Sequence, residues 1–268
     1  MPRLITYVAG FVFFAIVTMI MRSSSGWFAI SSGIAIGFLL PLVDTFITHF
    51  RDLKVVWYSI RTWRTRVRIS ASYLYRIRVE NEYLLVKGKR FDHFQPVGGV
   101  YKAHPSSSGF RNAINVLDDD LLLPDAVSEN DLRVRVPGKH LVQFMRWFEA
   151  ERGRETDGAR EFYEELVATG ILSSDTFRVV KYDRLERRYH PMRFSAWANS
   201  QEILIADILE LLPTPAQLEE LKRLRSRPNA EILWASERQI RRRGATEGGA
   251  SQTIRIADTA IWTIDASS

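Results

Sequence analysis

The stretch GAREFYEELVATGIL, residues 158–172, decides how the second half of the chain is interpreted. On a helix at about 100° per residue, Glu161, Glu164 and Glu165 share an arc of about 100°. The apolar residues of the stretch lie on the opposite side, in the stripe that a helix uses to cover a core. The stretch therefore predicts an amphipathic helix with one acidic face.

Two interpretations of this acidic face are open. Like charges three and four positions apart destabilise a helix by roughly 0.2–0.5 kcal/mol each, so the glutamates need solvent, Arg160 as a partner, or a cation. A solvated surface helix is the common case. The alternative is a site for a hard divalent ion such as Mg²⁺, which binds carboxylate oxygens and keeps positions open for water and substrate phosphates.

The location of the net charge of +6 is more informative than its size. Residues 1–70 hold eight Lys or Arg and two acids, whereas the remaining 29 bases and 29 acids balance. A nucleic-acid-binding protein more often carries its basic excess on the folded domain, so polymeric nucleic acid is not an expected partner. A basic excess beside apolar segments points to a membrane. The absence of cysteine excludes disulfides and thiolate zinc sites.

Two apolar segments, residues 4–21 and 27–43, contain no charged side chain. As helices at about 1.5 Å per residue, each is close to the roughly 30 Å of a bilayer core. Joined by RSSSG, they predict a transmembrane hairpin over residues 1–48. Six Lys or Arg follow in residues 51–70, against Arg22 alone in the loop, so the positive-inside rule places the C-terminal domain in the cytoplasm.

A cleaved signal peptide and a pair of buried core helices are the alternatives to this hairpin. The first apolar run is long for a signal peptide, and a second run follows it. Apolar character all round, with a basic flank on one side, argues against core helices. Small residues in the second segment permit close helix contact within or between hairpins: Ser31, Ser32, Gly33, Ala35 and Gly37.

Residues 49–70 form a basic juxtamembrane segment in which arginines interleave with Trp57, Tyr58 and Trp63. Such a mixture also occurs on nucleic-acid-binding surfaces. Directly after a membrane segment, however, basic and aromatic residues are typical of the membrane–water interface.

Residues 71–268 predict a mixed α/β (α+β) domain, because strands and helices follow without regular alternation. A β-hairpin is expected over 73–90 with its turn at Glu80–Asn81, and a helix capped by Thr214 over 214–226. An irregular insertion at about 101–155 includes a helix at 140–151. Further strands are expected at 177–183, 192–197, 202–211, 230–236 and 259–264, and a flexible loop at 241–252.

The segment REFYEEL, residues 160–166, resembles the core of the Nudix box, G-x5-E-x7-R-E-U-x-E-E-x-G-U. YLLVKG (83–88) and FQPVGGVYK (94–102) resemble the strand and Gly-Gly segment that lead into this box in Nudix hydrolases. Together with the apolar hairpin, ASYLYRI and RVRVPGKHLVQFMRWFE, they resemble the two-transmembrane SMODS-associated NUDIX proteins. That family accompanies CD-NTase cyclases in bacterial cyclic-oligonucleotide antiphage signalling (CBASS).

The resemblance implies a set of site residues. Glu161, Glu164 and Glu165 would bind Mg²⁺ or Mn²⁺, with Glu161 and Glu165 catalytic if the domain is active. Arg160 would orient them through a salt bridge, and Gly98 and Gly99 would shape the loop beside a nucleotide. Further candidate phosphate contacts lie in an Arg-rich run that could equally be solvated: Arg184, Arg187, Arg188 and Arg193.

The chain departs from the Nudix box at three points. From Gly99 to Arg160 it runs 61 positions, Arg152 stands where the upstream glutamate belongs, and Gly170 comes three residues late. Such departures are expected of a Nudix scaffold that has become a nucleotide sensor.

The resemblance implies a membrane effector. A cyclase would make a cyclic oligonucleotide, the cytoplasmic domain would bind it, and the hairpins would form a homo-oligomer that disrupts the lipid of the bacterial inner membrane. The alternative is a membrane-anchored, metal-dependent Nudix phosphohydrolase of nucleoside-diphosphate-linked substrates. A membrane-anchored scaffold is a third class.

Two further groups of polar residues are candidates for the site. Asp118, Asp119 and Asp120 could supply a fourth metal ligand, but an exposed acidic turn is the expected role. His190, which precedes a proline in an Arg-rich turn, is expected at the surface.

Overall fold

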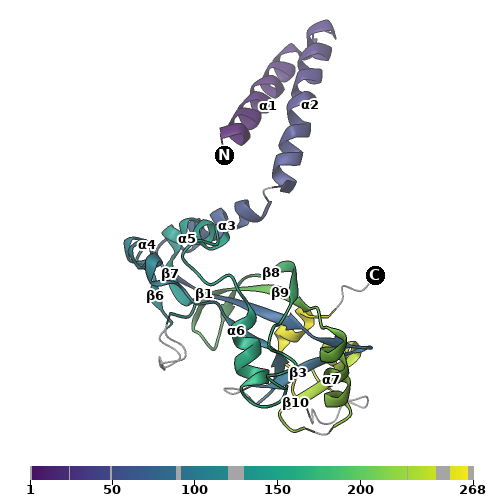
Figure 1. Cartoon of the computed structure of the whole chain (residues 1–268). Helices are drawn as coiled ribbons and strands as arrows, with labels where there is room; N and C mark the ends of the chain where they lie inside the picture. The colour runs from purple at the N-terminus through teal and green to yellow at the C-terminus, as the bar shows by residue number, and fades with distance from the viewer. Residues whose placement is uncertain are drawn as a thin grey trace. The chain divides into compact units, whose positions relative to one another are not determined.

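The computed structural model describes residues 2–23, 25–48, 50–88, 92–119, 130–227, 229–245 and 254–264 (Figure 1). The chain divides into two compact units, Met1–Arg61 and Thr62–Ser268. The second unit begins nine residues before position 71, where the sequence placed the start of the domain. Five of these nine residues, 66–70, enter its central strand, as described below.

The first unit is helical. It consists of α1 (Pro2–Ile20), a 3₁₀ turn η1 (Met21–Ser23), α2 (Ser25–Thr48) and α3 (Phe50–Arg61). α1 and α2 pack against each other, with the rings of Phe14 and Phe38 stacked at 5.9 Å and the hydroxyl of Thr18 donating to Ser31 at 2.9 Å. A Cβ on Gly10 would lie 2.7 Å from the ring of Phe38, so glycine permits this close approach.

Large apolar side chains on both helices are exposed, including Phe13, Met19, Trp27 and Leu40. One segment, Thr6–Ser23, is long and apolar enough to cross a membrane, with mean hydropathy 1.6. Gly26–Pro41 is apolar but shorter. Both predicted helices are therefore present, while only one of them meets the criteria for a span within the described residues. The two-span hairpin remains a prediction.

The second unit contains two sheets, which confirms the predicted mixed α/β domain. The larger has strand order β6-β7-β1-β9-β8, with β5 also paired to β1, and all its pairs are antiparallel except β1–β9. Its strands are β1 (Arg66–Arg76), β5 (Gly98–Val100), β6 (Leu117–Asp118), β7 (Arg133–Pro137), β8 (Tyr182–Ser195) and β9 (Ser200–Leu211). The smaller has order β10-β3-β2 with β4 on β3: β2 (Arg78–Val79), β3 (Glu82–Lys87), β4 (Phe94–Pro96) and β10 (Ile232–Ser236).

Helical segments flank the two sheets. The α-helices are α4 (Ser108–Ala113), α5 (Leu141–Glu149), α6 (Ala159–Phe162), α7 (Pro215–Arg225) and α8 (Glu237–Arg241). The shorter turns are η2 (Pro105–Ser107), η3 (Gly138–His140), the π-helical η4 (Tyr163–Val167) and the 3₁₀ helix η5 (Asp258–Trp262).

Strand β1 is the centre of the larger sheet. It pairs with β9 in parallel from Val67–Gln201 to Arg76–Glu210, and with β7 and β5 on its other edge. Val67, Ile69 and Tyr73 are fully buried, and most of their neighbours on β1 are buried as well. A strand buried on both faces explains why residues 66–70 belong to the domain although they carry basic side chains.

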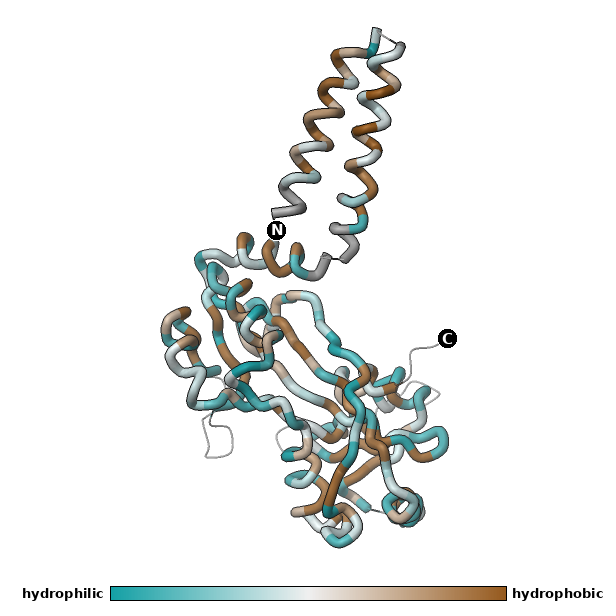
Figure 2. Tube along the Cα trace, turned by 45° about the horizontal axis from the view of Figure 1, so that its top comes forward, coloured by the Kyte–Doolittle hydropathy of each residue, from teal (hydrophilic) through white to brown (hydrophobic). Residues whose placement is uncertain are grey.

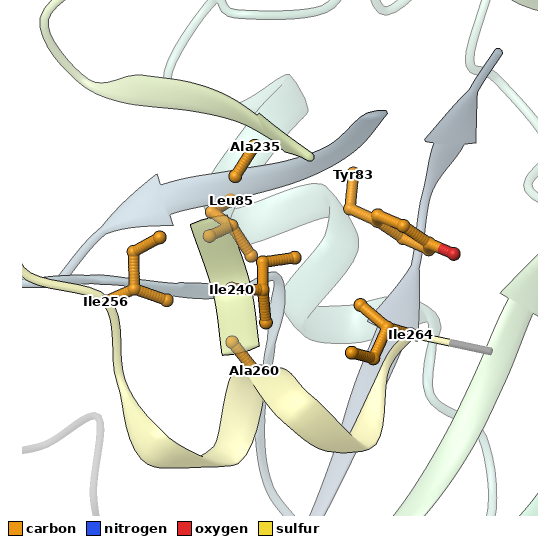
Figure 3. Packing of buried hydrophobic residues seen from close by; sticks show 7 residues of the cluster. All are labelled: Tyr83, Leu85, Ala235, Ile240, Ile256, Ala260 and Ile264. Atoms are coloured by element: carbon orange, nitrogen blue, oxygen red, sulfur yellow. The ribbon is translucent and has the colours of Figure 1, made fainter. Parts of the chain in front are cut away.

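The smaller sheet has its own core, in which residues from β3, β10, α8 and the C-terminal segment meet (Figure 3). Residues 259–264, predicted as a strand, fall largely in η5 instead. Ile256, Ala260 and Ile264 all pack into this cluster. Ile256 forms a β-bridge with Phe94 and Ile264 follows η5, so this spacing does not mark a helix. A short apolar run with β-branched residues does not distinguish a strand from a short helical segment.

The region 101–155 is not an irregular insertion. Its segment LRVRVP forms β7, with Leu132, Val134 and Val136 buried in alternation, and pairs with β1. The predicted hairpin turn is confirmed, since β2 and β3 pair around Glu80, whose φ is 55°. The predicted helices are also confirmed as α5 and α7, the latter with a capping box at Thr214. The loop predicted at 241–252 lies mostly outside the described residues.

A buried ion-pair network crosses the larger sheet. Arg68, 5% exposed, donates to Asp119 at 2.7 Å and to Glu202 at 2.6 Å, and Arg135 lies 3.4 Å from Asp119. The expectation that Asp119 belongs to an exposed turn is therefore wrong, although Asp118 is exposed. Asp120 lies outside the described residues.

We expect Arg68→Met to lower the free energy of unfolding by roughly 3–5 kcal/mol, because it leaves two buried carboxylates without their main partner. Denaturant titration followed by tryptophan fluorescence would measure the loss. Arg225→Met is the matched control, since Arg225 pairs with Glu80 at the surface, where solvent screens the pair and its loss costs little stability. Equal losses in the two variants would contradict a structural role for the network.

Candidate functional site

The helix that carries the three glutamates is α6 continued by η4. Phe162 and Leu166 are fully buried, and the ring of Phe162 packs 5.3 Å from that of Tyr75 and 5.6 Å from that of Phe177. The acidic side chains lie away from this core, as the amphipathic pattern predicts. The sequence did not reveal the π-helical turn, marked by the bond from Ala168 N–H to the Tyr163 carbonyl at 2.7 Å. Such turns are frequent at functional sites.

Two adjacent glycines bring the loop of β5 against this helix. A Cβ on Gly98, where φ is +150°, would lie 2.1 Å from the backbone oxygen of Tyr73. A Cβ on Gly99 would lie 2.1 Å from the carboxyl carbon of Glu161, so a side chain there would push that carboxylate aside. The Gly98 N–H donates to Glu165 at 3.0 Å. The backbone thus approaches the helix closely because both positions lack a side chain.

Arg160 is the hub of the site. Its guanidinium donates to Glu161 at 2.6 Å, to Glu155 at 3.1 and 3.3 Å, and to the Val100 carbonyl at 3.0 Å. Glu164 lies 3.5 Å away. The orienting contact that the resemblance implied for Arg160 is therefore present in the geometry.

No role for Glu155 was predicted from the sequence. It lies five positions before Arg160, whereas the Nudix box places its upstream glutamate eight positions before the arginine. Besides binding Arg160, its carboxylate accepts from the Lys102 N–H at 3.2 Å and so ties the loop before α6 to the end of β5. Spacing within the Nudix box could not show this, because Glu155 reaches the site through an extended loop rather than a helical turn.

Burial and charge shift the titration of the central groups. Burial raises the pKa of Glu161, against the opposing effect of the Arg160 charge. Burial also opposes the charge of Arg160, but its hydrogen bond to Glu155 and the neighbouring carboxylates outweigh this and raise its pKa. Burial together with the charge of Glu155 raises the pKa of Tyr73, so this phenol is neutral; its oxygen accepts from the Glu161 N–H at 3.4 Å.

The three glutamates do not converge on a common point. Glu161 and Glu164 both lie against one nitrogen of Arg160, whereas Glu165 turns to the Gly98 N–H. Across the residues that the structure describes, no group of three His, Cys, Asp or Glu side chains is arranged to hold a metal ion. Their oxygens suit Mg²⁺ or Mn²⁺ chemically, but the guanidinium stands where a shared cation would lie. This arrangement does not fit a three-carboxylate metal centre.

A pocket of about 210 Å³ opens beside Glu165. Gly170, which comes late for the Nudix box, has a φ of +73° and ends the helical segment at the rim of this pocket. Lys87, Thr169, Asn229 and Glu231 also line it. Polar groups of both charges thus surround a concave site next to the Gly-Gly loop.

Arg188 and Arg193 do not join the residues around Arg160. Arg188 is aligned with Ala206, Ala206 with Ser72, and Ser72 with Val100, so three strand spacings, roughly 14 Å, separate it from β5. Its guanidinium pairs with Glu186 at 2.5 Å, and Arg193 lies exposed farther along β8. The single nucleotide contact set predicted from the sequence is therefore divided between two regions.

Gly98→Ala should destabilise the domain by roughly 1–3 kcal/mol, because the Cβ would meet backbone atoms at a φ that side chains avoid. Thermal denaturation of the variant against wild type measures the loss. Gly109→Ala is the control, since a Cβ there meets nothing within 4 Å. An unchanged Gly98→Ala midpoint would show that the Gly-Gly approach to the helix is not required.

The raised pKa of Glu161 predicts a pH dependence. Because the folded value lies above the ordinary 4.5, Glu161 contributes stability that is complete below pH 4.5 and is lost as pH rises through its folded pKa. As pH rises across that window, the thermal midpoint of wild type should therefore fall relative to that of Glu161→Gln, because glutamine does not titrate. Exposed Glu219, whose pKa the hydrogen bond from Lys222 lowers, gives the control Glu219→Gln, which should lack this trend.

Comparison with known proteins identifies the family of the second unit. The chain matches no curated protein and no solved structure. A family model described as the SMODS-associated NUDIX domain matches residues 66–264. The match begins at the first residue of β1 and runs through η5, so it includes both sheets and the α6–η4 helix. The chain therefore belongs to the SMODS-associated NUDIX domain family.

Proposed function

We propose that the protein is the membrane effector of a bacterial cyclic-oligonucleotide antiphage (CBASS) system. In this proposal the NUDIX-family domain lies in the cytoplasm and binds a cyclic oligonucleotide made by a CD-NTase. The N-terminal helices then oligomerise and disrupt the inner membrane. The observation that carries the proposal is the union, in one chain, of a SMODS-associated NUDIX domain and an apolar helical hairpin.

The geometry around Arg160 supports binding rather than hydrolysis. Arg160 occupies the centre of the carboxylate group, and Glu165 binds the loop backbone instead of facing the other two glutamates. A guanidinium held in a fixed position suits recognition of a phosphate-bearing ligand. The neighbouring 210 Å³ pocket offers a concave surface for part of such a ligand.

The hairpin supports membrane insertion and association. Apolar residues follow both helices along their length (Figure 2), and the contacts between α1 and α2 leave many of them exposed. Ser31 and Ala35 are buried, whereas a Cβ at Gly33 or Gly37 would meet nothing within 4 Å. These glycines leave room on α2 for the close approach of a second hairpin. In α3, exposed Trp57 and Ile60 beside basic residues suit the membrane interface.

A membrane-anchored, metal-dependent Nudix phosphohydrolase is the second candidate. One observation favours it, because burial raises the pKa of Glu161, and a carboxylate with a raised pKa is suited to act as a general base. Hydrolysis would require the three glutamates to regroup around Mg²⁺ or Mn²⁺ away from Arg160.

Calorimetry of residues 62–268 against a panel of cyclic di- and trinucleotides tests the sensor. We expect at least one to bind with a micromolar or lower dissociation constant, because a phosphate-bearing ligand can meet cationic groups in this domain. Linear dinucleotides of the same bases are the control. Failure of every cyclic nucleotide to bind would refute sensing.

The double variant Glu161→Gln/Glu165→Gln separates the two candidates. In cells with an active cyclase, the full chain carrying both changes should still admit a membrane-impermeant dye if it is an effector. Loss of permeabilisation, with nucleotide binding and expression retained, would favour the hydrolase.

A further inference from the structure

We infer that Arg154, Arg184 and Arg187 form a second site, specific for a phosphoryl group, which the carboxylate of Glu151 occupies in the free protein. Glu151 follows α5, Arg154 lies in the loop before α6, and Arg184 and Arg187 project from β8. The site is separate from the residues gathered around Arg160. Of the four arginines that the sequence suggested as phosphate contacts, it contains Arg184 and Arg187 but not Arg188 or Arg193.

A single oxygen of Glu151 receives three guanidinium groups. Its Oε1 lies 2.5 Å from Arg184 Nη1, 3.1 Å from Arg187 Nη2 and 3.3 Å from Arg154 Nη2. One carboxylate oxygen is a poor match for three such donors, whereas a phosphoryl group offers several oxygens in a tetrahedral arrangement. The cluster has more donor capacity than its occupant uses.

Arg184 and Arg187 are fixed in place without Glu151. Asp207, which has no exposed surface, accepts from Arg187 Nε at 2.5 Å and from its Nη2 at 2.8 Å. Arg184 Nη2 lies 2.8 Å from the same carboxylate. The hydroxyl of Tyr101 donates to Asp207 at 2.6 Å and holds it in position.

Arg154 is held independently as well. Its guanidinium stacks 4.7 Å from the ring centroid of Tyr101 and 4.2 Å from that of Phe148. It donates to the carbonyls of Phe148 at 2.9 Å and Glu155 at 2.7 Å. Displacement of Glu151 would therefore leave three preorganised cations, of which Arg184 and Arg187 pair with Asp207, so the cluster would carry two positive charges more than that carboxylate balances.

The occupant lies at the entrance of the site. The side chain of Glu151 is 35% exposed and that of Arg184 is 38% exposed, whereas that of Arg154 is 1% exposed. Glu151 also has a φ of 56°, a conformation that non-glycine residues adopt at some cost. It can leave for solvent without disturbing the buried part of the cluster, and an anion can enter by the same path.

The identity of the natural ligand, a phosphodiester of a cyclic oligonucleotide, rests on the proposed function. The site itself does not, because any small phosphoryl anion meets the same three cations. Inorganic phosphate is therefore the probe, used on the full chain in detergent. Cyclic nucleotides are tested separately on the same variants.

We expect Glu151→Gln to bind inorganic phosphate about tenfold more tightly than wild type by calorimetry, because the competing charge is removed. Adding Arg184→Gln should abolish the gain. Glu186→Gln is the matched control, since Glu186 is paired with Arg188 on the same strand, and its affinity should remain that of wild type. Equal affinities of Glu151→Gln and Glu186→Gln, or a gain that survives Arg184→Gln, would overturn the inference.

A second measurement leaves Glu151 unchanged and covers the case in which Glu151→Gln fails to fold. Phosphate should raise the thermal midpoint of wild type, and Arg184→Gln should remove that rise; an equal rise in both proteins would overturn the inference. Phosphate binding without any cyclic-nucleotide binding would sink the proposed function but not this site. Cyclic-nucleotide binding that is indifferent to Glu151→Gln and Arg184→Gln would support the proposed function and rule out a cyclic oligonucleotide as the ligand of this site.

Discussion

The buried carboxylate of Asp207 is the constraint on which the charged half of the domain depends. A charge without exposed surface is tolerated only when it is paired and hydrogen-bonded. Arg184 and Arg187 on β8 pair with this carboxylate, and Tyr101, the residue after β5, donates a hydrogen bond to it. Because Tyr101 also stacks on Arg154, the constraint extends from the sheet into the segment that precedes α6.

The segment 151–160 connects the two charged regions of the domain. At one end Glu151 binds the arginines that pair with Asp207, and at the other end Arg160 binds the glutamates of the α6–η4 helix. Glu155 lies between, with its carbonyl on Arg154 and its carboxylate on Arg160. A change of occupant at the arginine cluster would therefore bear directly on the loop that positions Arg160. The 61 positions between Gly99 and Arg160, a defect for a Nudix box, hold the residues that make this connection.

Patterns in the sequence predicted those features of the fold that depend on residues only a few positions apart. The amphipathic helix, the Glu80 turn and the Thr214 cap depend on neighbours within a few positions, so spacing revealed them. Partners far apart in sequence were not predictable in the same way. Asp119 looked like a surface acid because Arg68, which lies 51 positions earlier, was assigned to a membrane-proximal segment. The resemblance implied that the glutamates share a cation. Spacing gives their angles on a helix but not the position of the Arg160 guanidinium, which lies against Glu161 and Glu164.

The free edge of the larger sheet bears on how copies of the chain associate. β8 ends the strand order and, among the described residues, pairs with β9 alone in that sheet, so its outer edge is open to pairing with another copy. Yet Pro191 removes a donor, the register shifts twice along the strand, and charged residues such as Arg188 recur on it. These features oppose edge-to-edge pairing. Large exposed apolar side chains are instead concentrated on α1 and α2, whose burial against lipid or further hairpins is favourable. The physical division is thus between a domain whose β8 edge opposes pairing with another copy and a pair of helices whose large apolar side chains are exposed.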